Sequence, residues 1–166
     1  RALQDVLGNH VQQAGSLVDS DHLRFDFTHF EAMTPEELAR VEKLANEQIM
    51  LALPTNIYET SLSSARKAGV TALFGEKYGE TVRVVEAGEF SKELCGGCHV
   101  SNTSEIGLVK IVSESSVGAN TRRIEALTSF DALDYLNGFE VPMKELSSKL
   151  RTPVQDVVAR VESTLA

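Results

Sequence analysis

Leu23-Arg24-Phe25-Asp26-Phe27 alternates apolar with charged side chains, and this stretch decides how the first part of the chain folds. Alternation with a period of two predicts a β-strand that has one face on a hydrophobic core and the other toward polar groups. Residues 16–18 form a second short apolar run, and the polar residues 19–21 between the two runs predict a turn. We therefore expect two neighbouring strands here.

The next stretch, Thr34-Pro35-Glu36-Glu37, predicts the start of a helix. Threonine followed three residues later by glutamate forms a capping box, and proline suits the first helical position. Apolar residues then recur at helical spacing as far as Pro54: Leu38, Val41, Ala45, Ile49 and Ala52. This pattern predicts a helix with one apolar face, which would pack on the strands.

Four later stretches predict further strands, namely residues 56–60, 81–87, 108–112 and 123–127. A glycine turn at residues 118–120 would join the last two. Ser61 is expected to cap a short helix that Gly69 ends, and residues 73–79 form a glycine-bounded loop. Helices and antiparallel hairpins in this order predict an α+β fold, an antiparallel sheet with packed helices, rather than a doubly wound sheet.

Both ends of the chain show helical spacing. Residues 3–7 predict a helix that ends at Gly8 or Gly15, and the absence of an N-cap before it predicts a piece cut inside a longer helix. Residues 130–136 predict another helix with a break near Gly138 and Pro142. Thr152-Pro153 then predicts the start of a terminal helix with an apolar stripe: Val154, Val157, Val158, Val161 and Leu165.

The composition is that of a globular chain of one domain with an appended element. Hydrophobic residues make up 42% and charged residues 24% of 166 residues. The net charge of −8 argues against broad non-specific nucleic-acid binding but permits a local basic patch. No apolar run has membrane-spanning length and no targeting segment is evident, so a cytoplasmic protein without a membrane partner is expected.

Cys95-Gly96-Gly97-Cys98-His99 concentrates chemically active side chains in five positions. Thiolate and imidazole are preferred zinc ligands, and two glycines allow a tight turn that brings Cys95 and His99 together. The same letters also spell the C-x-x-C-H attachment motif of c-type haem, which requires an exported protein. A third interpretation is a glycine-rich turn with small buried cysteines. Spacing alone leaves these alternatives open.

Five ordered stretches together resemble the editing domain of alanyl-tRNA synthetases. They are His10-Val11-Gln12-Gln13-Ala14-Gly15-Ser16, Leu23-Arg24-Phe25-Asp26-Phe27, Ala72-Leu73-Phe74-Gly75-Glu76-Lys77-Tyr78-Gly79, Glu93-Leu94-Cys95-Gly96-Gly97 with His99-Val100, and Arg122-Arg123-Ile124-Glu125-Ala126. The resemblance runs from residue 1 to about Tyr135. It implies an editing domain at 1–135, truncated at its N-terminus, and a helical linker at 136–166 that leads toward a C-terminal region.

This resemblance implies the fold of the threonyl/alanyl-tRNA synthetase second additional domain. It also implies a hydrolase that removes wrongly attached serine or glycine from tRNA(Ala), as one part of an ATP-binding ligase. The expected partners are the acceptor end of tRNA(Ala) and the rest of the synthetase chain. Two alternatives remain: a free-standing deacylase of the same superfamily that acts in trans, and a zinc- or tRNA-binding module without catalysis.

In the family, an H-x-x-x-H helix and a C-x-x-x-H loop together hold zinc, and the loop matches Cys95 and His99. The histidine pair would fall just before Arg1. Because two ligands hold zinc far less well than four, this chain is expected to bind zinc weakly or not at all. Cys98 stands where the family usually has threonine, either as a tolerated small side chain or as a competing thiolate.

The resemblance also implies substrate-binding roles for Gln13, Ser16 and Arg122. A pocket that must prefer serine over alanine has to hydrogen-bond the serine hydroxyl, and polar groups at Gln13 and Ser16 suit this task. The alternative is a satisfied polar pair beside a turn. Of the two neighbouring arginines, Arg122 is predicted to contact tRNA phosphate while Arg123 forms an ion pair. Zinc is expected to organise the substrate, and no general base is identified.

Overall fold

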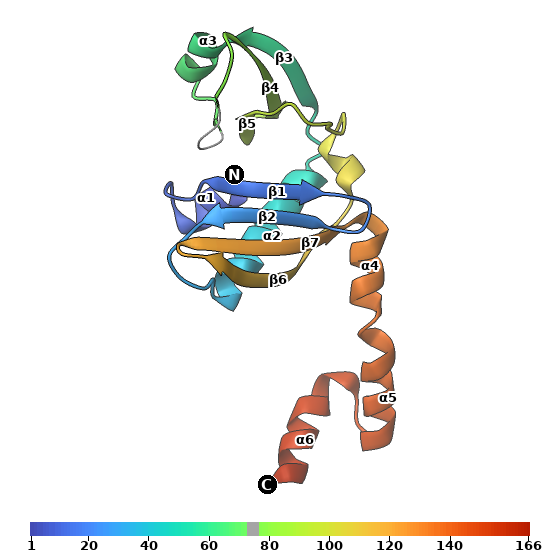
Figure 1. Cartoon of the computed structure of the whole chain (residues 1–166). Coiled ribbons are helices and arrows are strands. Elements are labelled where there is room, and N and C mark those ends of the chain that lie inside the picture. The colour runs from blue at the N-terminus through green and yellow to red at the C-terminus, as the bar shows by residue number, and fades with distance from the viewer. Residues whose placement is uncertain (73–76) are drawn as a thin grey trace.

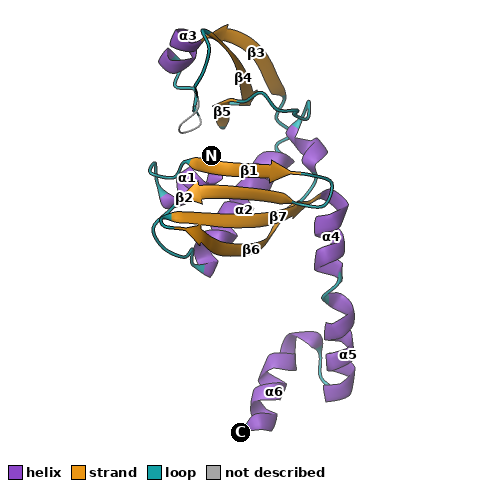
Figure 2. Ribbon diagram, in the orientation of Figure 1, coloured by secondary structure: helices purple, strands orange, loops and turns teal. Residues whose placement is uncertain are grey.

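The computed structural model describes residues 1–72 and 77–166. In this described part the strands form two separate antiparallel sheets, followed by a helical tail (Figure 1). The four-stranded sheet has the order β1 (Gln13–Val18), β2 (Leu23–Thr28), β7 (Thr121–Thr128) and β6 (Val109–Gly118). The three-stranded sheet has the order β3 (Thr55–Ser61), β4 (Thr81–Ala87) and β5 (Ser91–Leu94). Figure 2 shows helices packed beside antiparallel strands, so the predicted α+β class is confirmed.

The alternation in β2 places its aromatic side chains on the core of the first sheet. Phe27 is fully buried, and Phe25 packs against the same cluster. Two helices cover this face, α1 (Ala2–Leu7) and α2 (Pro35–Met50), and contribute Leu3 and Val41. Full burial of a phenylalanine removes enough apolar surface from water to stabilise the fold by about 1.5–3 kcal/mol. The predicted strand and its core face are confirmed.

Helix α2 begins as its sequence predicts. The Thr34 hydroxyl accepts a hydrogen bond from the Glu37 amide at 3.2 Å, and the Glu37 carboxylate accepts one from the Thr34 amide at 2.8 Å. These two bonds are the capping box, and Pro35 occupies the first helical position. The helix ends at Met50, earlier than the apolar spacing predicts, because Ala52 takes a left-handed conformation with φ 51°.

Side chains of α2 also cover the outer edge of the first sheet. Asn46 accepts a hydrogen bond from the Val109 amide at 2.9 Å and donates one to the Val109 carbonyl at 2.8 Å. Glu42, one helical turn earlier, accepts from the Ile111 amide at 2.7 Å. Four helical residues rise about 6 Å and two strand residues about 6.6 Å, so the spacings match. The helix therefore satisfies an edge that would otherwise be open to another strand.

The three-stranded sheet has a core of its own. Val82 and Val84 of β4 pack with Leu94 and with Ala65 of α3 (Leu62–Lys67). The Ser61 hydroxyl accepts a hydrogen bond from the Ser64 amide at 3.1 Å, which confirms the predicted cap of this helix. Strand β5 was not predicted, because Leu94 is its single buried residue and the other three are partly exposed polar residues.

The hairpin of β6 and β7 turns at the predicted glycine region, where Asn120 adopts φ 55°. Strand β6 continues through polar residues to Gly118, farther than its apolar run predicts, because cross-strand pairing with β7 holds it. The first four residues of the predicted loop 73–79 lie outside the described part of the chain. No helix in residues 1–72 or 77–166 has the length and apolar character needed to span a membrane.

The chain ends in three helices, α4 (Ser129–Asn137), α5 (Glu140–Leu150) and α6 (Val157–Leu165). The predicted break at Gly138 is present, but Pro142 lies inside the first turn of α5, where its missing amide costs nothing. The predicted start at Thr152 is wrong. The Thr152 amide donates to the Ser147 carbonyl and so helps to close α5, and a short 3-10 turn (Val154–Asp156) precedes α6.

The apolar stripe predicted for the terminal helix is buried at one position. Val157 is 4% exposed, whereas Val158 and Leu165 are 67% and 83% exposed. The predicted domain boundary near residue 135 falls within α4 and stays a prediction.

Candidate functional site

The Cys–His loop (residues 95–99) follows directly on β5 and is tied to the neighbouring strand β4. The Cys95 amide donates a hydrogen bond to the Arg83 carbonyl at 3.2 Å. The Arg83 side chain returns two bonds, from Nη1 to the Cys95 carbonyl at 2.7 Å and to the Gly97 carbonyl at 2.8 Å. Three hydrogen bonds thus connect one strand residue to the first half of the loop.

The loop brings Cys95 and His99 together at Gly97. A Cβ placed on Gly97 would lie 3.5 Å from Cys95 Sγ and 3.9 Å from His99 Nε2. Glycine therefore leaves open the space that both donor atoms face. Both atoms thus lie near Gly97, and a thiol and an imidazole are the donor types that zinc prefers; the metal role stays a prediction.

The electrostatic surroundings favour a neutral imidazole at His99. Desolvation lowers the pKa of His99, the positive charge of Arg83 lowers it further, and the Glu93 carboxylate acts in the opposite direction. A neutral ring nitrogen is the form that can ligate a metal. Residues 1–72 and 77–166 contain no cluster of three or more His, Cys, Asp or Glu side chains suited to a metal, so the loop supplies a pair of donors.

Two cavities meet at this loop. Cys95 and His99 line a cavity of about 190 Å³ together with Val85 and Glu93. Cys98, which is exposed, lines a neighbouring cavity of about 470 Å³ that His99 also borders. The second cavity lies beside the β1–β2 turn and the start of α4.

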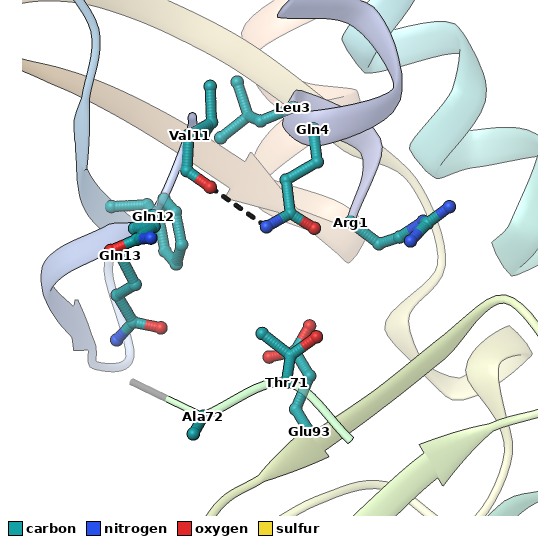
Figure 3. A pocket seen from close by; sticks show the side chains of 10 residues that line it. Arg1, Leu3, Gln4, Val11, Gln12, Gln13, Thr71, Ala72 and Glu93 are labelled. Atoms are coloured by element: carbon teal, nitrogen blue, oxygen red, sulfur yellow. Dashed lines mark hydrogen bonds between the residues drawn. The ribbon is translucent and has the colours of Figure 1, made fainter. Parts of the chain in front are cut away.

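A third, smaller pocket of about 60 Å³ lies between the two sheets (Figure 3). Gln13 of β1 and Gln4 of α1 line it on the side of the first sheet. Glu93 of β5 and Thr71 line it on the side of the second sheet. Glu93 also lines the cavity of Cys95. Glu93 therefore lines both the pocket of Gln13 and the cavity of Cys95 and His99.

Gln13 and Ser16 form a hydrogen-bonded pair. The Gln13 side-chain amide donates to Ser16 Oγ at 3.0 Å, across the bulge that separates them in β1. Gln13 lines the small pocket, whereas Ser16 is exposed and contacts Gln13 from outside it. The geometry thus fits both a substrate-binding pair and a pair that only satisfies its own hydrogen bonds, and the predicted substrate roles stay predictions.

Both neighbouring arginines are held in two-point ion pairs. Arg122 donates from Nη2 to Glu114 at 2.7 Å, with a second bond from Nε. Arg123 donates from Nε and Nη2 to the Asp26 carboxylate at 2.7 and 2.8 Å. The ion pair predicted for Arg123 is present. Arg122 is paired as well, so its predicted contact with phosphate requires release from Glu114.

His10 is an exposed residue. Its Nε2 nevertheless lies 2.9 Å from Nδ1 of His29, which is 7% exposed. The two imidazoles are hydrogen-bonded and stacked, and His10 also stacks on Phe30. The partner lies nineteen positions away, beyond the reach of a local pattern.

Residues 82–125 match the family described as the threonyl and alanyl tRNA synthetase second additional domain. This region contains all but the first residue of β4, together with β5, the Cys–His loop and most of the β6–β7 hairpin. The match thus covers part of each sheet together with the Cys–His loop.

The whole chain is also similar to alanine–tRNA ligases. It is 55% identical over 165 residues to that of Pelotomaculum thermopropionicum and 54% over 166 residues to that of Geobacillus kaustophilus. These alignments cover 99% and 100% of the chain but 19% of each relative. The ligase of Latilactobacillus sakei is 56% identical over 151 residues, 91% of the chain and 17% of that protein. The chain is therefore homologous to a segment of alanine–tRNA ligases and spans about a fifth of their length.

Sequence reasoning missed the residues that connect the parts of the site. Arg83 and Glu93 border the Cys–His loop, and Thr71 faces Gln13 across the small pocket. Arg83 did leave a signal, because it is a charged residue inside the apolar run of β4. Thr71 left none, since its position depends on how the two sheets pack.

Proposed function

We propose that this chain is the editing part of an alanine–tRNA ligase. It would hydrolyse the ester that joins serine or glycine to the terminal adenosine of tRNA(Ala). The observation that carries the proposal is that Glu93 lines both the pocket of Gln13 and the cavity of Cys95 and His99. The proposal thus assigns hydroxyl selection to the first of these spaces and metal binding to the second.

Gln13 is suited to recognise the serine side chain. Its amide nitrogen is oriented by the bond to Ser16, and in the described part of the chain its amide oxygen has no hydrogen-bond donor. A substrate hydroxyl can donate to this oxygen, whereas the methyl group of alanine cannot. A site that hydrogen-bonds a substrate hydroxyl can reject the analogue that lacks it by about 10⁴-fold or more.

Cys95 and His99 would hold zinc together with two further ligands. When bound, zinc would supply a positive charge that organises the ester group in the pocket. The residues of this chain do the rest: Glu93 and Thr71 close the pocket opposite Gln13, and the packing of the two sheets limits its volume to about 60 Å³. So small a space favours serine and glycine over larger amino acids.

The test is release of amino acid from tRNA(Ala) charged with serine or with alanine, using a chain extended upstream to include an H-x-x-x-H pair. We expect hydrolysis of the serine ester and little of the alanine ester. Gln13→Ala should slow serine release about ten-fold, the value of one lost hydrogen bond. Gln155→Ala, at an exposed position of the tail, is the matched control and should change nothing.

Three outcomes separate the alternatives. Metal binding without ester hydrolysis would indicate a binding module. Serine release by the extended chain alone at the rate of a full-length ligase would support a deacylase acting in trans, whereas a slower rate supports an editing part that depends on the rest of the ligase. Equal rates for the Gln13→Ala and Gln155→Ala variants would show that Gln13 does not select the substrate.

A further inference from the structure

We infer that Arg83 is the positioning residue of the Cys–His loop: it sets the geometry of the two metal donors without being a ligand itself. That the loop binds a metal rests on the proposed function. That Arg83 holds the loop rests on the hydrogen bonds of Arg83 alone.

Strand β4 directs Arg83 away from the core and toward the Cys–His loop. Val82 and Val84 point into the core of the second sheet, so the residue between them lies on the opposite face. Val85 lines the same cavity as Cys95 and His99. A long cationic side chain on this strand thus lies beside the loop rather than in the core.

The bonds of Arg83 are made to the loop backbone. One nitrogen, Nη1, contacts the carbonyl oxygens of Cys95 and Gly97 at 2.7 and 2.8 Å. Two carbonyls two residues apart can reach one donor only when the chain curves around it, and the intervening Gly96 permits that curvature. The curved backbone then directs Cys95 Sγ and His99 Nε2 to the same space at Gly97.

Arg83 has a carboxylate opposite it in the sheet but forms no ion pair with it. Its partner in the register of β3 is Glu59, which pairs directly opposite it. Among the described residues no ion pair within 4 Å joins Arg83 to Glu59 or to another carboxylate. A cation beside two metal donors also repels a metal ion, so direct electrostatic help to the metal does not explain its presence. Its hydrogen bonds to the loop backbone do explain its presence.

The experiment compares Arg83→Met, which keeps the length but removes every donor, with Arg83→Lys, which keeps a single cationic donor group. Arg66→Met, at an exposed arginine on α3 of the same unit, is the matched control. Two readouts are measured. The first is amide hydrogen exchange of residues 95–99 in the 166-residue chain without metal. The second is cobalt(II) affinity of the upstream-extended chain, followed by thiolate-to-cobalt absorption.

We expect Arg83→Met to exchange at least about ten-fold faster in the loop and to bind cobalt about 10- to 100-fold more weakly, as for other residues that support metal ligands. Arg83→Lys should lie between this variant and the wild type, and Arg66→Met should match the wild type. Loop exchange and cobalt affinity of Arg83→Met equal to those of Arg66→Met would overturn the inference.

The outcome can be separated from that of the proposed function. If the unaltered extended chain binds no cobalt, the metal part of the proposed function fails, and loop exchange still decides the role of Arg83. If the chain binds cobalt but hydrolyses no ester, the editing activity fails and the positioning role is decided by both readouts. Circular dichroism shows whether Arg83→Met folds; if it does not, Arg83→Lys carries the comparison.

Discussion

Replacing Asn46 by alanine tests whether α2 stabilises the fold through the edge of β6. The Asn46 amide group pairs with both backbone groups of Val109, at 2.8 and 2.9 Å. The substitution removes both bonds and leaves a partly buried N–H and C=O unpaired. In this arrangement a helix side chain bonds to the edge strand as a fifth strand would. Its loss should therefore lower the free energy of unfolding of the first sheet.

The magnitude follows from these bonds. Two hydrogen bonds at about 1 kcal/mol each are lost, and alanine regains about 0.6 kcal/mol of helix propensity over asparagine. The free energy of unfolding should therefore fall by about 1.5 kcal/mol. For a chain of this size that change lowers Tm by about 3–6 °C.

Urea denaturation followed by circular dichroism measures the effect. Asn137→Ala, at the exposed last residue of α4, is the control because it changes the same side chain in a helix without an edge to cover. Asn46→Asp should fall between the two, since it keeps the acceptor for the Val109 amide and loses the donor. A free energy of unfolding for Asn46→Ala within about 0.3 kcal/mol of that for Asn137→Ala would refute the reasoning, since one hydrogen bond alone contributes more.

Three further predictions concern charge, burial and the loop. The Arg123 hydrogen bonds lower the pKa of Asp26 below 3.8, so the pair stabilises the fold above that pH and the benefit is lost as the pH falls through the lower folded-state pKa; the Tm difference between wild type and Asp26→Asn should shrink below pH 3.8 and would contradict this if it stayed constant. His10→Ala leaves buried His29 without its partner and should lower the free energy of unfolding by about 1–3 kcal/mol in urea denaturation; no change would show that water replaces the bond. Gly97→Ala adds a methyl group close to both donor atoms, at ordinary contact distances, so the Tm should hold while the cobalt affinity of the upstream-extended chain falls about ten-fold; unchanged affinity would place the metal elsewhere.

Local patterns predicted most of the fold, because each acts within a few residues. The alternation of residues 23–27 specified β2, and the Thr34 capping box specified the start of α2. Predictions failed where backbone hydrogen bonds to a neighbouring element decide the structure. Thr152 has the sequence of a helix start, but its amide is bound by the preceding helix. Strand β5 has almost no apolar signal and exists because β4 pairs with it.

The candidate site shows the same division. Cys95 and His99 were singled out by their spacing within five adjacent positions, and the resemblance then favoured a metal site over the alternatives that spacing left open. Gln13 was identified through resemblance, and its position beside Glu93 required both sheets to be in place. Composition and periodicity do not predict how one sheet packs against another. The residues that line a pocket between two sheets are therefore the ones that sequence reasoning misses.

Arg83 illustrates what such residues contribute to the shape of a site. A pair of metal donors is useful only when the backbone between them holds one curvature, and two glycines alone leave that curvature unspecified. The charged side chain from β4 removes the freedom through bonds at 2.7 and 2.8 Å. The rigidity of the loop is thus supplied by the sheet rather than by the motif. A Cys-x-x-x-His sequence transplanted without that strand should converge less well and bind metal more weakly.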